Sequence, residues 1–232
     1  MTGQQHQVIQ QHLLPGDGKE AVAILLCGRL NHPQCHALSV YEIFPVPYSV
    51  CTVREPDQIT WATSAIIPAL EKAAELGLAV VKIHSHPGWY AEFSHVDDRA
   101  DRALFPSIYG WVDSDAPHGS AVMLPDGSIF ARTVYEDGHF TPFELVSVAG
   151  DDIKLWFHQL KLEQGETTKR TEQAFGNHTT NLLQRVSVAV IGCSGTGGPV
   201  IEQLGRYSTK RIVGVDTDIV EEKTSTAFPT RL

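Results

Sequence analysis

The chain has 232 residues, of which 42% are hydrophobic and 19% are charged, values typical of a globular protein and not of a disordered one. Its 27 acidic and 18 Lys or Arg residues give a net charge of −9, which argues against a general nucleic-acid binder, because such proteins need a basic face. No apolar run approaches the about 18 residues of a membrane span, and no basic segment followed by an apolar one opens the chain. We therefore expect a cytoplasmic protein without nucleic-acid or membrane partners. The four cysteines lack CxxC spacing, which predicts reduced thiols.

Hydrophobic periodicity predicts the elements of the first part of the chain. Short apolar or alternating runs predict strands over 21–26, 38–46, 78–83, 108–112, 121–124 and 128–135. Apolar residues at helical spacing predict helices over 58–76, ending at Gly77, and over 97–105. This order predicts a mixed α/β domain over residues 1–150.

The second part of the chain changes character. A polar stretch over 159–180 is followed by a predicted strand over 186–191, a helix over 199–207 and a strand over 211–215. This order is typical of a βαβ unit. We therefore expect a linker with a preceding helix over 151–185 and a second, short domain over 186–232.

Two histidines at the end of a predicted strand point to a metal site. Residues two apart in a strand face the same side, so His84 and His86 can direct both imidazoles to one point. A third ligand is available from Asp97, at the start of the next predicted helix. Two His and one carboxylate leave one tetrahedral position open for water, as in catalytic zinc sites. The alternative for a His-x-His pair alone is two ordinary polar residues.

A hydrolytic zinc site also needs a proton carrier, because zinc lowers the pKa of water to about 7 but does not deliver the proton to a leaving group. Glu20, at the mouth of the first predicted strand, is the candidate, although it could instead be a solvated edge residue; Glu92 and Glu42 are the rival bases. Other polar groups are expected to be solvated or to support the ligands: His95, Asp98, Asp101 and His118. Three loop aromatics could contact substrate or anchor the loop: Trp89, Tyr90 and Phe93.

The spacing of these residues resembles a known family. His84-x-His86-Pro87, followed by Ser94-x-x-Asp97, reproduces the H-x-H-x(7)-S-x-x-D signature of the JAMM (MPN-plus, Prok-JAB type) zinc isopeptidases. The resemblance covers about residues 10–145 and implies an MPN fold with a mixed sheet. It also implies that His84, His86 and Asp97 bind zinc, that Glu20 is the general acid/base, and that the Ser94 hydroxyl stabilises the oxyanion.

A glycine-rich turn follows the predicted strand at 186–191. Gly192, Ser194 and Gly197 give the pattern G-x-S-x-x-G, and Gly195 lies inside it. Asp216 lies 24 residues after Gly192, near the spacing of a ribose-binding acid. From these residues alone, the segment could bind NAD or ATP.

A wider stretch resembles the opening of a ThiF/MoeB-type adenylyltransferase. The resemblance lies in 170–185, VSVAVIGCSGTGGPVIEQLGR and IVGVDTDIVEE. It implies ATP, with Asp216 toward the ribose and Arg170 or Arg206 toward phosphate. The family's Asn-Leu-Asn-Arg-like element is replaced by 224–231. We therefore expect a partial ThiF-like segment, which is either part of a longer fusion or a degenerate remnant. ATP and Mg²⁺ would bind only in a longer parent protein.

These observations lead to one main hypothesis and two alternatives. The main one is a zinc isopeptidase that uses metal-activated water to cleave after the C-terminal tail of a ubiquitin-like protein or its conjugates, with E2-like or activating-enzyme proteins as further candidate partners. The second is processing of a sulfur-carrier protein's C-terminus. The third is a metal-free MPN scaffold that only binds ubiquitin-like partners.

Overall fold

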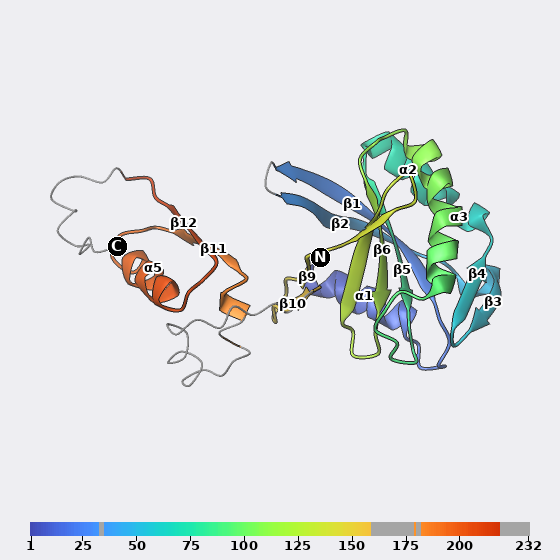
Figure 1. The fold of residues 1–232 in the computed structure, drawn as a ribbon, viewed down its shortest axis with the longest axis horizontal. Coiled ribbons are helices and arrows are strands. Elements are labelled where there is room, and N and C mark those ends of the chain that lie inside the picture. Colours follow the sequence, from blue (N-terminus) through green and yellow to red (C-terminus); the bar gives the residue numbers. More distant parts are fainter. Residues whose placement is uncertain (33–34, 159–178, 180–181, 219–232) are drawn as a thin grey trace. The chain divides into compact units, whose positions relative to one another are not determined.

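The computed structural model describes residues 1–32, 35–158, 179 and 182–218. The chain divides into two compact units, residues 1–160 and 161–232 (Figure 1). The first unit therefore continues about ten residues past the predicted domain boundary at 150. In the described part of the chain, no helix combines the length and apolar character that crossing a membrane requires.

The first unit is built on a six-stranded mixed sheet with the order β2-β1-β5-β6-β7-β8. Its strands are β1 (Val22–His32), β2 (Cys35–Pro45), β5 (Ala79–Ser85), β6 (His118–Met123), β7 (Ile129–Val134) and β8 (Phe140–Pro142). Neighbouring strands run antiparallel, except that β5 and β6 run parallel. A mixed α/β domain with a mixed sheet was expected, and the structure confirms it.

Helices cover both faces of this sheet (Figure 1). They are α1 (Gly3–Leu13), α2 (Ile67–Leu76) and α3 (His95–Val112). Because successive strand residues point to opposite faces, β1 divides between two cores. Ile24 and Leu26 pack with α2 and α3, whereas Ala23 and Leu25 pack with Ile9 of α1.

Two hairpins and two 3₁₀ turns complete the first unit. The hairpins are β3 (Cys51–Glu55) with β4 (Gln58–Trp61), and β9 (Leu145–Val148) with β10 (Lys154–Phe157); the turns are η1 (Tyr48–Val50) and η2 (Thr63–Ile66). Trp156 of β10 stacks on His6 of α1 with ring centroids 5.6 Å apart. Part of the predicted linker thus belongs to the first unit.

Two sequence predictions were wrong in this unit. The helix predicted over 58–76 begins only at Ile67, because its first residues form β4 and η2. The strand predicted over 108–112 is the last part of α3, which continues through Pro106. Phe105, Ile108 and Val112 are buried at helical spacing, and their packing outweighs the backbone hydrogen bond that Pro106 cannot make.

The described part of the second unit has the predicted strand–helix–strand order. It comprises β11 (Ser187–Ile191), α5 (Gly197–Arg206) and β12 (Arg211–Val215). The two strands pair in parallel, as a crossover helix between them requires. Arg170 and the segment 224–231, both singled out above, lie outside the described residues.

Candidate metal centre

The end of β5 directs two imidazoles to one point. His84 lies in register with Val22 of β1 and Val122 of β6, so strands on both sides hold it. His86 follows the strand, and its backbone N–H donates to the Met123 carbonyl at 3.0 Å. The two Nε2 atoms lie 3.0 Å apart, and both side chains are buried. The predicted same-face geometry is therefore present.

The N-terminus of α3 supplies the carboxylate. Ser94 caps the helix, and its backbone N–H and hydroxyl both donate to Asp97 Oδ2 at 2.7 Å. This capping box fixes the Asp97 side chain on its own helix. Asp97 Oδ1 then lies 2.9 Å from His84 Nε2, and Oδ2 lies 3.4 Å from His86 Nε2. The structure thus brings together the three residues predicted as ligands.

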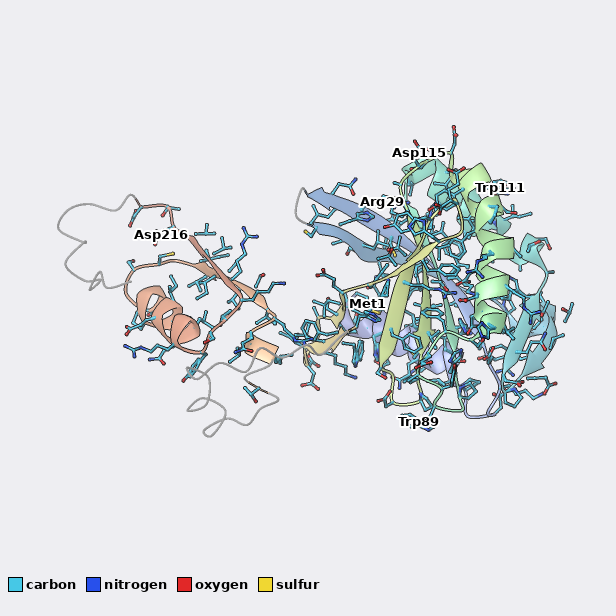
Figure 2. All side chains as sticks on the ribbon, in the orientation of Figure 1. Met1, Arg29, Trp89, Trp111, Asp115 and Asp216 are labelled. Carbon is cyan, nitrogen blue, oxygen red and sulfur yellow. The ribbon has the colours of Figure 1, made fainter. Side chains whose placement is uncertain are left out.

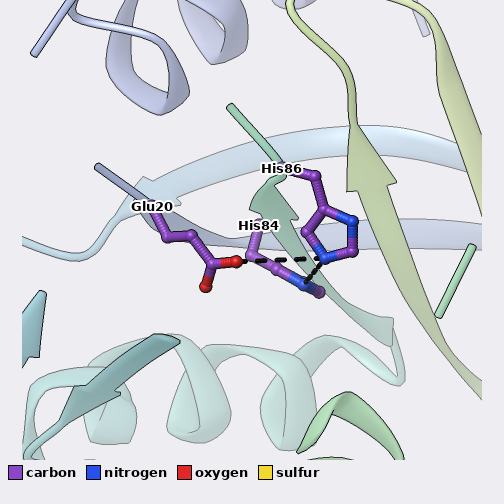
Figure 3. A group of neighbouring side chains, drawn as sticks. All are labelled: Glu20, His84 and His86. Carbon is purple, nitrogen blue, oxygen red and sulfur yellow. Dashed lines mark hydrogen bonds and ion pairs between the residues drawn. The ribbon is translucent and has the colours of Figure 1, made fainter. Parts of the chain in front are cut away.

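Glu20 approaches the same point from the start of β1. Its side chain is 6% exposed, and its Oε1 lies 3.9 Å from His86 Nε2 (Figure 3). Ligand atoms of Glu20, His84 and His86 all lie within 4.8 Å of one another. The backbone N–H of Glu20 donates to the Glu55 carbonyl at 2.9 Å, so the β3–β4 hairpin sets its position.

Burial and mutual contacts shift the pKa values of these groups. Burial raises the pKa of Glu20 to about 8, although the nearby His86 opposes this shift. Burial also lowers the pKa of His84, although its hydrogen bond with Asp97 opposes this. For Asp97, burial is outweighed by hydrogen bonds with the two histidines, which hold its pKa well below the usual range. For His86, burial is outweighed by the bonds with Asp97 and the Tyr90 carbonyl, and its pKa is raised.

The donor set fits a zinc ion. The Nδ1 atom of His86 lies 2.7 Å from the Tyr90 carbonyl, which fixes the tautomer with a free lone pair on Nε2, as outer partners of metal-bound histidines do. Two nitrogens about 2.0–2.1 Å from a tetrahedral ion would lie about 3.3 Å apart, close to the 3.0 Å observed between His84 and His86. The buried group of Glu20, His84 and His86 could therefore hold a metal, and its chemistry suits zinc.

The two rival bases are placed less favourably than Glu20 for proton transfer beside the two histidines. Glu92 is exposed on the loop before α3. Glu42 is on β2, two strands from β5, and forms an ion pair with Lys72 at 2.5 Å. His95 is exposed, and the carboxylates of Asp98 and Asp101 bind Arg132.

His118 is remote from the site. It begins β6 opposite the start of β5, and its Nδ1 accepts the Val80 N–H at 2.9 Å. His84 lies at the other end of the same pair of strands, in register with Val122. His118 is therefore a buried core histidine and not a ligand.

The loop after His86 exposes aromatic side chains. Trp89 is 59% exposed and lies on a loop at one end of the first unit (Figure 2). Its φ of 63° is uncommon for a residue other than glycine. Tyr90 is 52% exposed, while its carbonyl holds His86. Phe93 instead packs edge-on against Phe130 with centroids 5.2 Å apart.

The glycine-rich turn brings its predicted residues together in the second unit. Gly192 and Gly195 have φ values of 87° and 47°, and an ideal Cβ on Gly197 would lie 1.6 Å from the Gly192 carbonyl oxygen. The Asp216 carboxylate accepts the backbone N–H of Cys193 at 2.6 Å. Arg206 forms an ion pair with Glu202 at 2.6 Å. These contacts explain the glycines by backbone geometry.

The sequence interpretation did not single out the Tyr90 carbonyl, which contacts His86, or the two buried cations that form ion pairs with Asp101, Lys82 and Arg132. Lys82 and Arg132 are buried within strands. A lysine inside the apolar run LAVVKI was a usable signal, because a buried charge needs a partner. The carbonyl had no such signal.

More than half of the chain matches a known protein family. The family described as prokaryotic homologs of the JAB domain, Prok-JAB, matches residues 4–130. This range contains Glu20, both histidines, Ser94 and Asp97. It ends before the second unit, so it does not bear on the ThiF resemblance. No curated protein matches the chain.

Proposed function

Because this chain belongs to the Prok-JAB family of JAB/MPN metalloproteases, we propose that it is a zinc-dependent peptidase or isopeptidase that cleaves after the C-terminal tail of a ubiquitin-like protein. The observation that carries the proposal is the convergence of His84, His86 and Asp97 beside the buried Glu20. A closed structural site would have no use for a second carboxylate beside its ligands.

His84, His86 and Asp97 would hold the ion. Asp97 is favoured over Glu20 as the third ligand, because its oxygens lie 2.9 and 3.4 Å from the two Nε2 atoms, whereas Glu20 Oε1 lies 3.9 Å from the nearer one. The bound zinc would supply a Lewis acid that polarises the substrate carbonyl and acidifies water.

Glu20 is the proposed proton carrier. Its Oε1 would take a proton from the attacking water and deliver it to the nitrogen of the leaving amine as the C–N bond breaks. The Glu55 carbonyl, which fixes the Glu20 backbone, keeps this carboxylate beside the histidines. Ser94 is the proposed oxyanion donor, for which its hydroxyl would have to turn away from Asp97.

The substrate tail is expected to bind in an extended form, because main-chain pairing aligns a peptide without demanding particular side chains. The exposed side chains of Trp89 and Tyr90 offer apolar contacts next to the ligand His86. They are the candidates to contact the residues around the cleaved bond.

The test uses the full chain with its metal content measured, and two substrates: a ubiquitin-like protein fused to a reporter through a peptide bond, and the same protein joined to a lysine. Wild-type protein should contain one zinc ion and release the reporter. Glu20→Gln should retain zinc and lose turnover, since an amide of nearly the same shape cannot carry a proton. Asp97→Asn should lose zinc.

Glu92→Gln is the matched control, because this exposed glutamate lies in the same region and should leave turnover unchanged. Absence of zinc from native preparations, or near-normal activity of Glu20→Gln, would contradict the proposal. Tight binding of the ubiquitin-like protein without cleavage would indicate the scaffold alternative. Cleavage confined to sulfur-carrier tails would indicate the processing alternative.

A further inference from the structure

The first two turns of α3 contact the sheet through charged side chains. The buried residues of this helix are Asp97, Asp101, Phe105, Ile108, Tyr109 and Val112. The apolar ones all lie from Phe105 onward, and those N-terminal to it are the two aspartates. Apolar packing therefore anchors the C-terminal part of α3, while carboxylates fix the part that carries the candidate ligand.

Asp101 binds two cations from two different strands. Lys82 of β5 forms an ion pair with Asp101 Oδ1, and Arg132 of β7 reaches Oδ2 at 2.6 Å. Asp101 is fully buried, and Lys82 and Arg132 are 3% and 6% exposed. Ser120 of β6 lies in register with both cations, so a small side chain separates the two long ones. This row across three strands leaves space for both cations to meet one carboxylate.

Arg132 also holds the segment that enters α3. Its guanidinium lies between the rings of Phe93 and Phe140, 3.8 and 3.7 Å from their centroids. Phe93 directly precedes the capping residue Ser94. A second nitrogen of Arg132 binds Asp98 in the first turn. One side chain thus contacts the loop, the first turn and the second turn of the helix.

We infer that Lys82, Asp101 and Arg132 form a positioning cluster that sets the distance between Asp97 and the two histidines. Lys82 precedes His84 by two residues on the same face of β5, and Asp101 follows Asp97 by one helical turn. β5 and α3 therefore each carry one member of the cluster and one candidate ligand, and β7 supplies Arg132. This inference rests on the proposed metal centre, and its members act through Asp97.

A cluster that served stability alone would be replaceable by apolar side chains. Replacing buried ion pairs with apolar residues of similar volume often leaves stability unchanged or raises it, whereas removing one partner is strongly destabilising. Ion pairs and forked guanidinium contacts have direction, which apolar contacts lack. The two roles can therefore be separated by experiment.

The experiment compares the wild-type full chain with Lys82→Met/Asp101→Leu/Arg132→Met, with Arg132→Lys, and with Ile108→Ala. Zn²⁺ affinity is measured by competition with a chromogenic chelator, and the site is probed by the visible absorption of bound Co²⁺. Urea unfolding reports the fold separately. Ile108→Ala is the control, because it removes buried packing from the far part of the same helix.

We expect the triple variant to remain folded but to bind Zn²⁺ about 10- to 100-fold more weakly, the usual effect of losing outer partners of metal ligands, with an altered Co²⁺ spectrum. Arg132→Lys keeps the charge but not the forked geometry, so it should bind Zn²⁺ more tightly than the triple variant and less tightly than wild type. Ile108→Ala should unfold more easily with wild-type affinity. A triple variant with wild-type Zn²⁺ affinity and Co²⁺ spectrum would overturn the inference. If wild-type protein binds no metal, the proposed function fails, and the positioning role is then tested in metal-free crystal structures. A distance between Asp97 Oδ1 and His84 Nε2 in the triple variant equal to the 2.9 Å described here would overturn the inference.

Discussion

Acid should destabilise the first unit through His118, a histidine that the fold keeps neutral. Its side chain is fully buried, and its Nδ1 accepts the Val80 N–H at 2.9 Å. Protonation would place a hydrogen on that acceptor and break the bond. Burial, helped by the positive charge of Arg29, lowers the pKa of His118 to about 3. In the unfolded chain the pKa returns to about 6.5.

The sign and size of the effect follow from these two pKa values. Above pH 6.5 neither state binds the proton, so His118 costs no stability. Between pH 6.5 and 3 the unfolded state binds more protons, and the free energy of unfolding falls by about 1.4 kcal/mol for each pH unit. At pH 5 this loss amounts to about 2 kcal/mol.

The measurement compares wild-type protein with His118→Asn by urea unfolding at pH 7 and pH 5, followed by tryptophan fluorescence. The Asn side-chain oxygen can accept the Val80 N–H but does not titrate near these pH values. The variant should lose about 2 kcal/mol less than wild type between the two pH values, whatever its stability at pH 7. Equal losses in the two proteins would refute the reasoning, as would a His118 resonance that titrates near pH 6.5.

Four further predictions concern the candidate centre, a turn of the first unit, the glycine-rich turn and the division into two units. Ser94→Ala should lower turnover by about 10²- to 10³-fold with unchanged Zn²⁺ affinity if the hydroxyl stabilises the oxyanion, whereas weaker Zn²⁺ binding would show that it acts by holding Asp97. Gly127→Ala should destabilise the first unit in urea unfolding by more than Gly77→Ala, for which about 1–2 kcal/mol is expected. Both glycines have positive φ, but only at Gly127 would a Cβ crowd Gln10 and His6, at 2.9 and 3.0 Å. Equal effects of the two substitutions would mean that the crowding is relieved. Isothermal titration with Mg-ATP should show weak or no binding, because Asp216 already accepts a backbone N–H of the glycine-rich turn, and micromolar affinity would contradict this. A chain shortened to end near residue 160, after β10, should keep peptidase activity.

The sequence predicted the centre better than the elements around it. His84 and His86 were predicted because strand periodicity places them on one face, and Asp97 because it begins the next predicted helix and fits the S-x-x-D spacing of the family signature. The start of α2 was misplaced because Trp61 lies four residues before Ala65 and so extends the helical spacing backwards, although Ile59 and Trp61 also alternate as in a strand. Pairing with β3 decides between the two, and that contact is not local.

Helix α1 shows the opposite case, in which a local signal was present and not used. Thr2 and Gln5 form a capping box, and Ile9 and Leu13 follow at helical spacing. The positioning cluster could not be predicted in the same way. Its three members come from β5, α3 and β7, and only the register of the sheet brings Lys82 and Arg132 beside one carboxylate.

The capping box at the start of α3 has a consequence for how this protein can vary. Asp97 must satisfy the backbone of its own helix and also reach the two histidines. Glutamate is a common partner in capping boxes, but its additional methylene would displace the carboxylate from the imidazoles. The residue at position 97 must therefore meet two requirements with one short side chain. In a deep mutational scan it should tolerate fewer residues than Ser94, where threonine preserves the hydroxyl.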